Sequence, residues 1–320
     1  MRLLVCGGAG FIGSAYVRAA LTGELEGVAS VVVLDKLTYA GNLSNLASVA
    51  DDPRCRFVHA DIADAGVWKS LRGEYDAVLN FAAESHVDRS IADPSAFVTT
   101  NVLGAQTVFA AALEAGARVI HVGTDEVYGS ILSGAWTEES PLAPNSPYSA
   151  SKAAAELMAR AYFVTYGLDV CTTRGGNTFG AYQHPEKLIP RFVTNLIRGE
   201  RLPLYGSGEN KRNWMPVEDH VRAIHVVLQR GVAGESYNIG GAELSNLELT
   251  SRVVEWFGAS ADVVEHVADR PGHDLRYCVD DGKLRDLGWR PGGRSLDEDL
   301  TATFEWYRHN SAWWEPLVSP

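Results

Sequence analysis

The stretch CGGAGFIGS, residues 6–14, follows a short apolar run and opens an amphipathic segment. Gly8, Gly10 and Gly13 fit the spacing G-x-G-x-x-G, and Gly7 extends it to G-x-x-G-x-x-G. Glycine permits a tight turn and lets backbone N–H groups approach a pyrophosphate closely, while the N-terminus of a following helix supplies a favourable field. Because the motif stands between a predicted strand and a predicted helix, it predicts a dinucleotide-binding loop.

Outward from this loop, the first half of the chain alternates short apolar runs with longer amphipathic stretches. The apolar runs are typical of strands buried on both faces: RLLVC, SVVVLD, CRFVHAD, DAVLNFAA and RVIHVGT. Helical patterns lie between them, such as FIGSAYVRAALTG and AFVTTNVLGAQTVFAAALEAG. This rhythm predicts βαβ units and therefore a Rossmann-type α/β fold with a doubly wound parallel sheet, which binds ligands beyond the carboxyl ends of its strands.

The alternation of strand and helix patterns becomes less regular after about residue 170. The stretch GGNTFGAYQHPEKLIP is rich in Gly, Pro and polar residues and indicates an irregular region. Further strands are expected at LPLYG and ESYNIGG, and a closing helix at SLDEDLTATFEWYRHN. We expect residues 1–170 to form a cofactor-binding domain, with a segment near 212–240 returning to it, and residues 171–320 to form a smaller C-terminal lobe that binds the substrate.

Composition narrows the functional classes. The 320-residue chain has a formal net charge of −12, which argues against a protein that grips nucleic acid or an anionic membrane. Its four cysteines form no CxxC pair and have no companion histidines at zinc spacing, so we expect free thiols in a reducing compartment and no metal site. No uninterrupted apolar run approaches the roughly 18 residues of a membrane span. A cytoplasmic protein is expected.

Acidic residues follow two of the predicted strands. Asp35 ends the second strand, at the distance from the glycine loop where a carboxylate reaches the ribose hydroxyls of the adenosine half. An acid there repels a 2′-phosphate and favours NAD over NADP, although the adjacent Lys36 weakens the preference. Asp61, after the third strand, is either an adenine contact or a simple loop acid.

The stretch HVGTDEVYGS, residues 121–130, places Asp125 and Glu126 side by side at the end of a predicted buried strand, directly after Thr124. Like charges so close in a poorly solvated place repel, so one of the two carboxyl groups should have a raised pKa. The pair is either an accident of a solvated loop or a matched acid and base.

A second motif stands in NSPYSASKAAAELMARAYF. Ser146 is a good N-cap and Pro147 suits the first helical position, which places Tyr148 and Lys152 four residues apart on one helix face. An ammonium near a phenol favours the phenolate, so we expect Lys152 to lower the pKa of Tyr148. The tyrosine could then serve as a base for a hydroxyl while a nicotinamide accepts hydride. The spacing alone is common by chance and gains weight from the glycine loop and the acidic pair.

These features resemble the extended short-chain dehydrogenase/reductase family, also described as NAD-dependent epimerases and dehydratases. Within it the chain is most similar to the dTDP-glucose 4,6-dehydratase group. The resemblance runs nearly end to end through GGAGFIGS, LDKLTYAGNL, FAAESHVDRS, TNVLGAQT, TDEVYGS, PNSPYSASKA, YQHPEKLIPRF, YNIGG and ADRPGHDLRY. The Thr–Asp–Glu triplet is its specific part, because epimerases and reductases of the superfamily usually lack the acidic pair.

The resemblance implies a nucleotide-sugar 4,6-dehydratase of deoxysugar and antibiotic biosynthesis, with tightly bound NAD and an NDP-hexose substrate, for which we expect dTDP-glucose. Tyr148 would take the C4 hydroxyl proton while the C4 hydride passes to NAD. Glu126 would remove the C5 proton, and a protonated Asp125 would donate to the departing C6 hydroxyl, after which the hydride returns to C6. Thr124 would hydrogen-bond the sugar, and Lys152 would assist Tyr148.

The same resemblance assigns the binding residues. The cofactor residues are Gly7, Gly10, Phe11, Ile12, Gly13, Asp35, Lys36, Leu37, Thr38, Asp61, Ile62, Phe81, Ala82, Ala83, Ser85, Thr100, Tyr148, Lys152 and Thr178. The substrate residues are Ser85, Thr124, Asn177, Lys187, Leu188, Pro203, Tyr205, Arg212, Asn246, Arg270 and His273. For each cation the alternative is an ordinary surface charge, and for His86 and Asp88 we favour a satisfied polar network.

The chain departs from the family around the expected cleft. It has TRGGNTFGAYQ where relatives have TRCSNNYGPYQ, so the differences include Gly175, Gly176 and Thr178. The others are Gly123, Phe179, Ala181, Asn213 and Pro216. Extra glycines suggest a reshaped sugar pocket. The alternatives are a related epimerase, 5,6-dehydratase or decarboxylase, or a non-catalytic NAD-binding protein.

We also expect a homodimer. The Ala-rich helices at 96–114 and 147–163 have enough apolar surface to pack on the sheet and on a partner, and family members pair through a four-helix bundle. The alternative is that both faces are buried within one chain.

Overall fold

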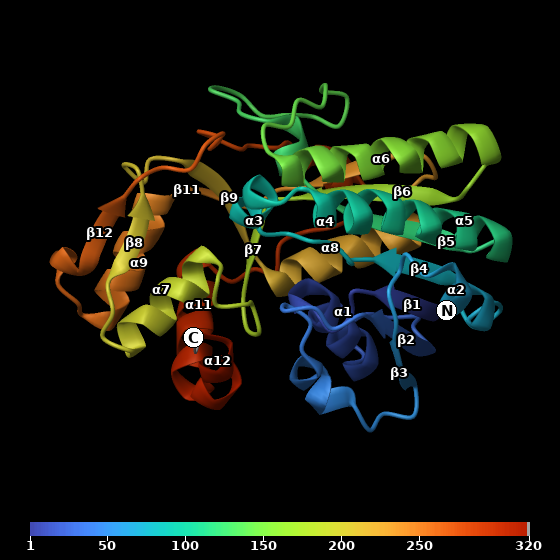
Figure 1. Ribbon diagram of the computed structural model, residues 1–320, viewed down its shortest axis with the longest axis horizontal. Helices are drawn as coiled ribbons and strands as arrows, with labels where there is room; N and C mark the ends of the chain where they lie inside the picture. The colour runs from blue at the N-terminus through green and yellow to red at the C-terminus, as the bar shows by residue number, and fades with distance from the viewer. Residues whose placement is uncertain (319–320) are drawn as a thin grey trace.

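A seven-stranded sheet forms the centre of the larger lobe in the computed structural model, which describes residues 1–318 (Figure 1). Its strands are β1 (Arg2–Cys6), β2 (Ser30–Asp35), β3 (Cys55–His59), β4 (Ala77–Asn80), β5 (Arg118–Thr124), β6 (Val170–Gly175) and β10 (Ser236–Ile239). They lie in the order β10-β6-β5-β4-β1-β2-β3, and every neighbouring pair is parallel. The predicted Rossmann-type parallel sheet is confirmed.

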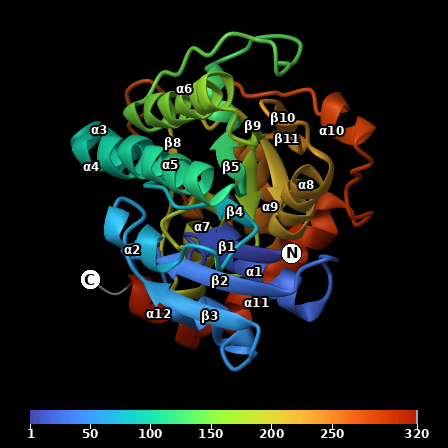
Figure 2. The same ribbon diagram turned by 90° about the vertical axis from the view of Figure 1, so that its right-hand side faces the viewer.

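Helices cover both faces of this sheet, as the turned view in Figure 2 shows. On one face lie α1 (Phe11–Thr22) and α8 (Val217–Arg230), and on the other α2 (Ala65–Ser70), α5 (Ala105–Ala115) and α6 (Pro147–Tyr166). Side chains alternate along a strand, so Leu3 and Val5 join the first core while Leu4 and Cys6 join the second. Burial on both faces explains why these strands are apolar throughout.

The helix expected at 96–116 is divided in the structure. It consists of α4 (Ser95–Phe97), the π-helix η2 (Val98–Gly104) and α5. By length and composition, the run Ser95–Ala115 could cross a membrane, since its mean hydropathy is 1.4. The sequence did not indicate a membrane-spanning helix, because polar residues interrupt the apolar ones along this run. Val108, Phe109 and Ala112 on this run are buried in the core of the large lobe.

The smaller lobe combines two short sheets with helices. Its three-stranded sheet has the order β11 (Ala242–Ser245), β9 (Lys211–Pro216), β7 (Asn177–Phe179), and its two-stranded sheet joins β12 (Val264–Val267) to β8 (Leu202–Tyr205). The helices are α7 (Leu188–Ile197), α9 (Asn246–Phe257), α11 (Leu296–His309) and α12 (Ser311–Val318). The predicted strand at LPLYG is β8, the predicted strand at ESYNIGG is β10 of the large sheet, and the predicted closing helix is α11, so all three are confirmed. A separate apolar core holds the small lobe together.

The chain passes between the lobes more than once. After β6 it enters the small lobe at β7, returns along α8 to β10 in the large sheet, and then leaves again at β11. The domain boundaries 1–170 and 171–320 stay a prediction. Because the strands are parallel, the residues that follow β1, β2, β4 and β5 meet at one edge of the sheet. The remaining elements are η1 (Leu43–Val49), α3 (Val87–Ala92), η3 (Asp125–Tyr128), η4 (Ala261–Val263) and α10 (Gly282–Asp286).

Candidate active site

Three adjoining cavities run along the carboxyl edge of the sheet and into the small lobe. The Asp35 cavity, about 520 Å³, is lined by the ends of β1, β2, β3 and β4. The central cavity, about 1220 Å³, lies over the glycine loop, the acidic pair and the Tyr148 helix. The outer cavity, about 1060 Å³, lies largely in the small lobe. Neighbouring cavities share lining residues, so together they form one continuous trough.

The glycine loop fits a closely approaching ligand. Gly7 has a φ of 73°, and a Cβ on it would lie 2.6 Å from the backbone nitrogen of Ala82. A Cβ on Gly13 would lie 2.3 Å from the carbonyl oxygen of Gly7. Helix α1 begins directly after Gly10, which offers no side-chain cap to its first N–H groups. The loop therefore presents bare backbone donors at the start of a twelve-residue helix, as a pyrophosphate requires.

Asp35 is buried beside this loop and accepts hydrogen bonds from the backbone N–H groups of Ala9 (3.0 Å) and Leu37 (2.8 Å). Its neighbour Lys36 turns away from it, donating to the Thr100 hydroxyl at 3.1 Å and lying 3.4 Å from the carboxylate of Asp61. Because Asp61 offsets the charge of Lys36, the lysine provides little attraction for a 2′-phosphate. The geometry of the Asp35 cavity therefore fits NAD.

The acidic pair lies at the point where β5 ends and the turn η3 begins. Thr124 ends the strand, and its hydroxyl accepts a hydrogen bond from the backbone N–H of Glu126 at 3.3 Å. Burial, reinforced by the charge of Glu126, raises the pKa of Asp125 to about 8. Burial also raises the pKa of Glu126, while the charges of Arg270 and Arg212 lower it. The sequence predicted that one of the two pKa values is raised, and in the structure burial raises both, that of Asp125 to about 8.

Tyr148 and Lys152 lie on the first turns of α6, which starts with a capping box made by Ser146 and Ser149. The Lys152 ammonium donates to the carbonyl oxygen of Val122 at 2.7 Å, and burial lowers its pKa to about 8. The expectation that Lys152 lowers the pKa of Tyr148 is wrong for this structure. Burial raises the pKa of the phenol and the charge of Glu126 raises it further, while a hydrogen bond with Thr124 acts in the opposite direction.

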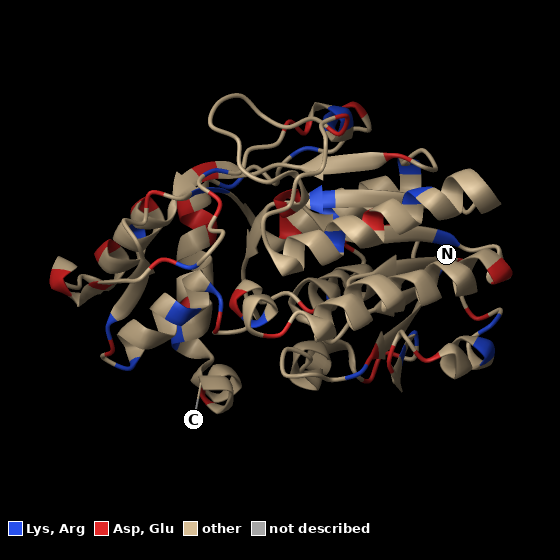
Figure 3. Cartoon of the chain, turned by 45° about the horizontal axis from the view of Figure 1, so that its top comes forward, with Lys and Arg blue, Asp and Glu red and all other residues tan. Residues whose placement is uncertain are grey.

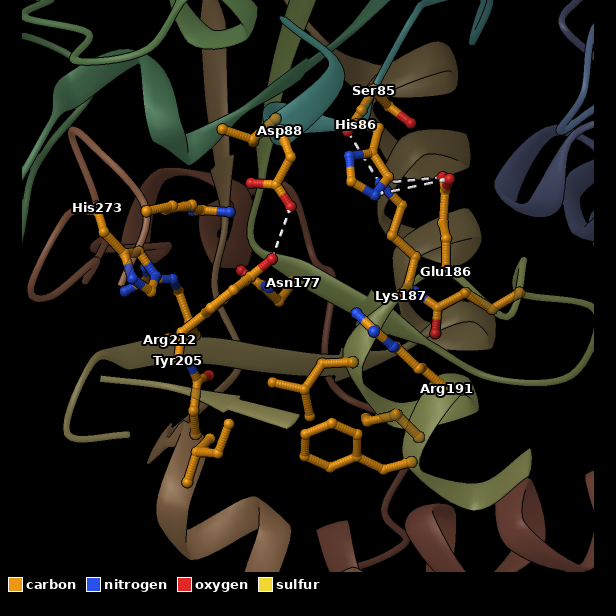
Figure 4. Close-up of a pocket in the computed structure, with 18 of the residues that line it drawn as sticks. Ser85, His86, Asp88, Asn177, Glu186, Lys187, Arg191, Tyr205, Arg212 and His273 are labelled. Atoms are coloured by element: carbon orange, nitrogen blue, oxygen red, sulfur yellow. Dashed lines mark hydrogen bonds and ion pairs between the residues drawn. The ribbon is translucent and has the colours of Figure 1, made fainter. Parts of the chain in front are cut away.

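Positive side chains gather in the outer cavity, shown in Figure 4. Lys187 donates to the carbonyl oxygen of Ser85 at 2.9 Å, and Arg212 donates to the carbonyl oxygen of Asp274 at 2.9 Å and lies over the Tyr277 ring. The Nε of Arg270 is buried without a hydrogen-bond partner within the described residues. Lys187 also lies 3.7 Å from the carboxylate of Glu186. Cations gathered in one cavity are able to offset a diphosphate.

His86 and Asp88 belong to polar contacts that cross from the large lobe to the small one. Tyr205 donates to Asp88 at 3.0 Å, and His86 lies 3.7 Å from the carboxylate of Glu186 (Figure 4). Both residues also line the outer cavity, and one oxygen of Asp88 is buried without a partner in the part of the chain that is described. The satisfied polar network favoured from the sequence is thus present only in part, and its contacts form part of the wall of the trough.

The cavities bring together all but one of the residues that sequence reasoning assigned to ligands. Leu37 is the exception: its φ is 52°, and its side chain packs against the apolar core under α1. Several lining residues were not assigned, among them Gln183, Glu186, Arg191 and His220. Gln183 and Glu186 stand in the irregular stretch 175–190, and their polar side chains beside Lys187 were the available signal. His220 lies on a helix of ordinary amphipathic pattern and gave no such signal.

Comparison with known proteins supports this geometry. Residues 4–298 match the family model described as GDP-mannose 4,6 dehydratase. A dTDP-glucose 4,6-dehydratase of Streptomyces niveus is 54% identical, with 100% of this chain and 96% of the relative covered, and one of Streptomyces antibioticus is 53% identical over 99% and 95%.

Solved structures agree. The dTDP-glucose 4,6-dehydratase of Streptomyces venezuelae, solved with NAD and a second ligand bound, has a TM-score of 0.97 and 59% identity over 99% of this chain and 100% of that one. A UDP-glucuronic acid 4-epimerase of Bacillus cereus, solved with UDP-glucuronic acid and NAD, has a TM-score of 0.89 and 27% identity over 96% and 99%. The fold is thus shared with epimerases, while the higher identity lies with dehydratases.

Proposed function

The chain belongs to the GDP-mannose 4,6 dehydratase family, and from that premise we propose how its trough works. It is an NAD-dependent nucleotide-sugar 4,6-dehydratase, a hydro-lyase of deoxysugar biosynthesis. Its substrate is proposed to be dTDP-glucose, which would become the 4-keto-6-deoxy sugar. The single observation that carries the proposal is that two adjacent carboxyl groups, both with a pKa raised by burial, share a cavity with Tyr148 above a dinucleotide loop.

The cofactor residues fit NAD on three counts. The glycine loop leaves no room for a Cβ, Asp35 is buried at the adenosine end, and Lys36 is paired with Asp61. The adenosine would occupy the Asp35 cavity and the nicotinamide the central cavity. When bound, NAD accepts a hydride from the sugar and later returns one.

The chain's own side chains move the protons. Tyr148 would take the proton of the C4 hydroxyl as its phenolate; burial disfavours that form, while the hydrogen bond with Thr124 and the positive charge of the nicotinamide ring of bound NAD favour it. The Thr124 hydroxyl would also contact the sugar. Glu126, whose pKa is raised by burial and lowered by the charges of Arg270 and Arg212, takes the C5 proton and gives it back to C5 when the hydride returns to C6. Asp125 is protonated up to about pH 8 and donates to the departing C6 hydroxyl. Two acids are needed because water is lost across two neighbouring carbons.

The outer cavity would hold the nucleotide and its diphosphate. Lys187, Arg212 and Arg270 face the expected diphosphate, and Asn246 and His273 line the far wall. Ser85 lines both the central and outer cavities, at the proposed junction of cofactor and sugar. Figure 3 shows segments of both charge signs interspersed over both lobes, and with a formal net charge of −12 we propose no nucleic-acid partner.

We propose a homodimer that works in the cytoplasm. Val98 and Leu103 on η2, and Leu157 and Val164 on α6, are each more than half exposed on packed neighbouring helices. Burying such a stripe against a second copy is favourable. Leu157→Glu is expected to shift sedimentation toward the monomer. Val232→Glu, at an equally exposed apolar residue elsewhere, should leave the oligomeric state unchanged, and equal effects of both variants would refute this surface.

The reaction is tested by incubating the purified protein with a panel of nucleotide hexoses and following product mass. The proposal expects loss of one water from dTDP-glucose with no net consumption of NAD. An unchanged mass with an inverted hydroxyl would instead identify an epimerase, and no reaction with any sugar would point to a binding protein.

A further inference from the structure

His220, on α8, has no role in the reaction as derived above, yet it lines the central cavity. It is 2% exposed, and the cavity wall around it includes Gly175, Gly176 and Thr178. Tyr148 and Lys152 line the same cavity. Since Asp35 marks the adenosine end of the trough, this wall lies at the nicotinamide end.

The imidazole is bonded to Thr178. Its Nδ1 lies 2.7 Å from the Thr178 hydroxyl oxygen, and the carbonyl oxygen of Thr178 accepts a hydrogen bond from the Gln183 side chain at 2.8 Å. Thr178 is therefore held on two sides, by its hydroxyl and by its backbone. The only other acceptor recorded for the hydroxyl in the described chain is the carbonyl oxygen of Gly176, at a long 3.4 Å.

Gly175 makes room for this arrangement. A Cβ at Gly175 would lie 2.7 Å from both Cε1 and Nε2 of His220, a distance that real side chains do not adopt. The departure of this chain from its family at residue 175 thus coincides with the position of the imidazole ring. A side chain there would displace His220 from Thr178.

The hydrogen bonds around His220 indicate which group donates in its contact with the Thr178 hydroxyl. Nε2 is buried and has no partner among residues 1–318. A buried N–H without an acceptor is rarer in proteins than an unsatisfied acceptor, so the proton belongs on Nδ1 and is donated to Thr178. The Thr178 hydroxyl then keeps its own proton for a ligand. Burial lowers the pKa of His220 to about 4, so a neutral ring stands beside the positively charged nicotinamide.

We propose that His220 is a positioning residue which, through its Nδ1–H, turns the Thr178 hydroxyl into a donor toward the carboxamide oxygen of the nicotinamide. A donor to that oxygen fixes which face of the ring meets the sugar and draws electron density from the ring that accepts hydride. The inference deepens the proposed function and rests on it.

The test compares two isosteric variants. In His220→Asn, the side-chain amide can place an N–H where the imidazole has Nδ1–H. In His220→Leu, the leucine side chain has the same branched shape as asparagine but no hydrogen-bond donor. Each protein is equilibrated with mixtures of NAD and ADP-ribose, which lacks nicotinamide, and the bound ligands are quantified after gel filtration. Loss of one hydrogen bond predicts about a fivefold fall in the NAD to ADP-ribose ratio for His220→Leu, with the ratio largely kept in His220→Asn.

Thr178→Val and His220→Leu together form a double-mutant cycle. It should lower the ratio by a similar factor, and His220→Leu should add little in its presence, because the histidine acts through the hydroxyl. Equal losses of NAD and ADP-ribose in His220→Leu, or additive effects of the two substitutions, would overturn this inference alone. A wild-type protein that retains neither ligand would overturn the proposed function with it.

Discussion

The central and outer cavities meet at Ser85, yet they are built in different ways. The central cavity takes its reactive groups from two short stretches, Thr124–Glu126 and Tyr148–Lys152, where burial shifts the pKa of each group. The outer cavity is lined from several separate segments, and its cations Lys187, Arg212 and Arg270 each stand on a different one. We infer that burial of ionisable groups prepares the central cavity for proton transfer, and that several charged contacts together bind the substrate in the outer cavity.

The largest effect is expected for Asp125→Asn, which tests whether the central cavity carries the chemistry. If Asp125 is the acid that protonates the leaving hydroxyl, its loss should lower kcat by about 10²- to 10⁴-fold with KM nearly unchanged. Asp51→Asn, at an exposed acid with no assigned role, is the matched control. Turnover is measured as water loss by mass spectrometry. A variant that keeps dehydrating at the wild-type rate would remove the acidic pair from the mechanism.

The same substitution should stabilise the protein. The pKa of Asp125 is 3.8 in the ordinary state and about 8 when folded, so the folded chain holds a proton that the unfolded chain releases between these values. Stability conferred by that proton is full below pH 4 and is lost as pH rises to about 8. At about 1.4 kcal/mol per pKa unit, Asn at 125 should gain a few kcal/mol over the wild type by pH 8 and almost nothing at pH 4.

Thermal melts of both proteins across this range measure the effect. A difference in melting temperature that widens with pH supports a desolvated acid in the central cavity. A constant difference would mean that Asp125 titrates normally and that the contrast between the two cavities is overstated.

Arg270→Gln tests the outer cavity. Removing one charge-assisted contact to a diphosphate should raise KM about tenfold to thirtyfold and change kcat little at neutral pH. Because the charge of Arg270 also lowers the pKa of Glu126, the acid limb of the kcat profile should move to higher pH. Arg201→Gln, an exposed cation of the same lobe, is the control. A large fall in kcat at neutral pH, with KM unchanged, would place Arg270 in the chemistry instead.

The same contrast explains what could be predicted from sequence. The strand rhythm and the glycine loop predicted the large sheet, because strands buried on both faces must be apolar throughout. The acidic pair was visible because its two residues are adjacent and because a family resemblance gave them roles. The pKa of Tyr148 was predicted in the wrong direction, since the depth of burial depends on how α6 packs on β5 and cannot be inferred from the spacing of Tyr148 and Lys152.

His220 and the contacts of Glu186 could not be foreseen for a similar reason. Each depends on a partner far along the chain: Thr178 stands 42 residues from His220, and Tyr39 stands 147 residues from Glu186. Periodicity reports which side of a helix is buried, but it does not report what that side meets. The outer cavity in particular required resemblance, because its residues come from segments that are far apart in the sequence.

The smallest effect is expected where the two lobes touch, at Tyr205 and Asp88. Tyr205→Phe removes one partly exposed hydrogen bond, so KM should rise only about threefold with kcat unchanged. The double variant Tyr205→Phe/Asp88→Ala should show no further loss beyond Asp88→Ala, since the pair acts through one bond. Steady-state kinetics on all three variants measure this coupling. Independent, additive effects would show that each residue touches the nucleotide by itself, and the wall of the outer cavity would then bind through separate contacts rather than through a joint between lobes.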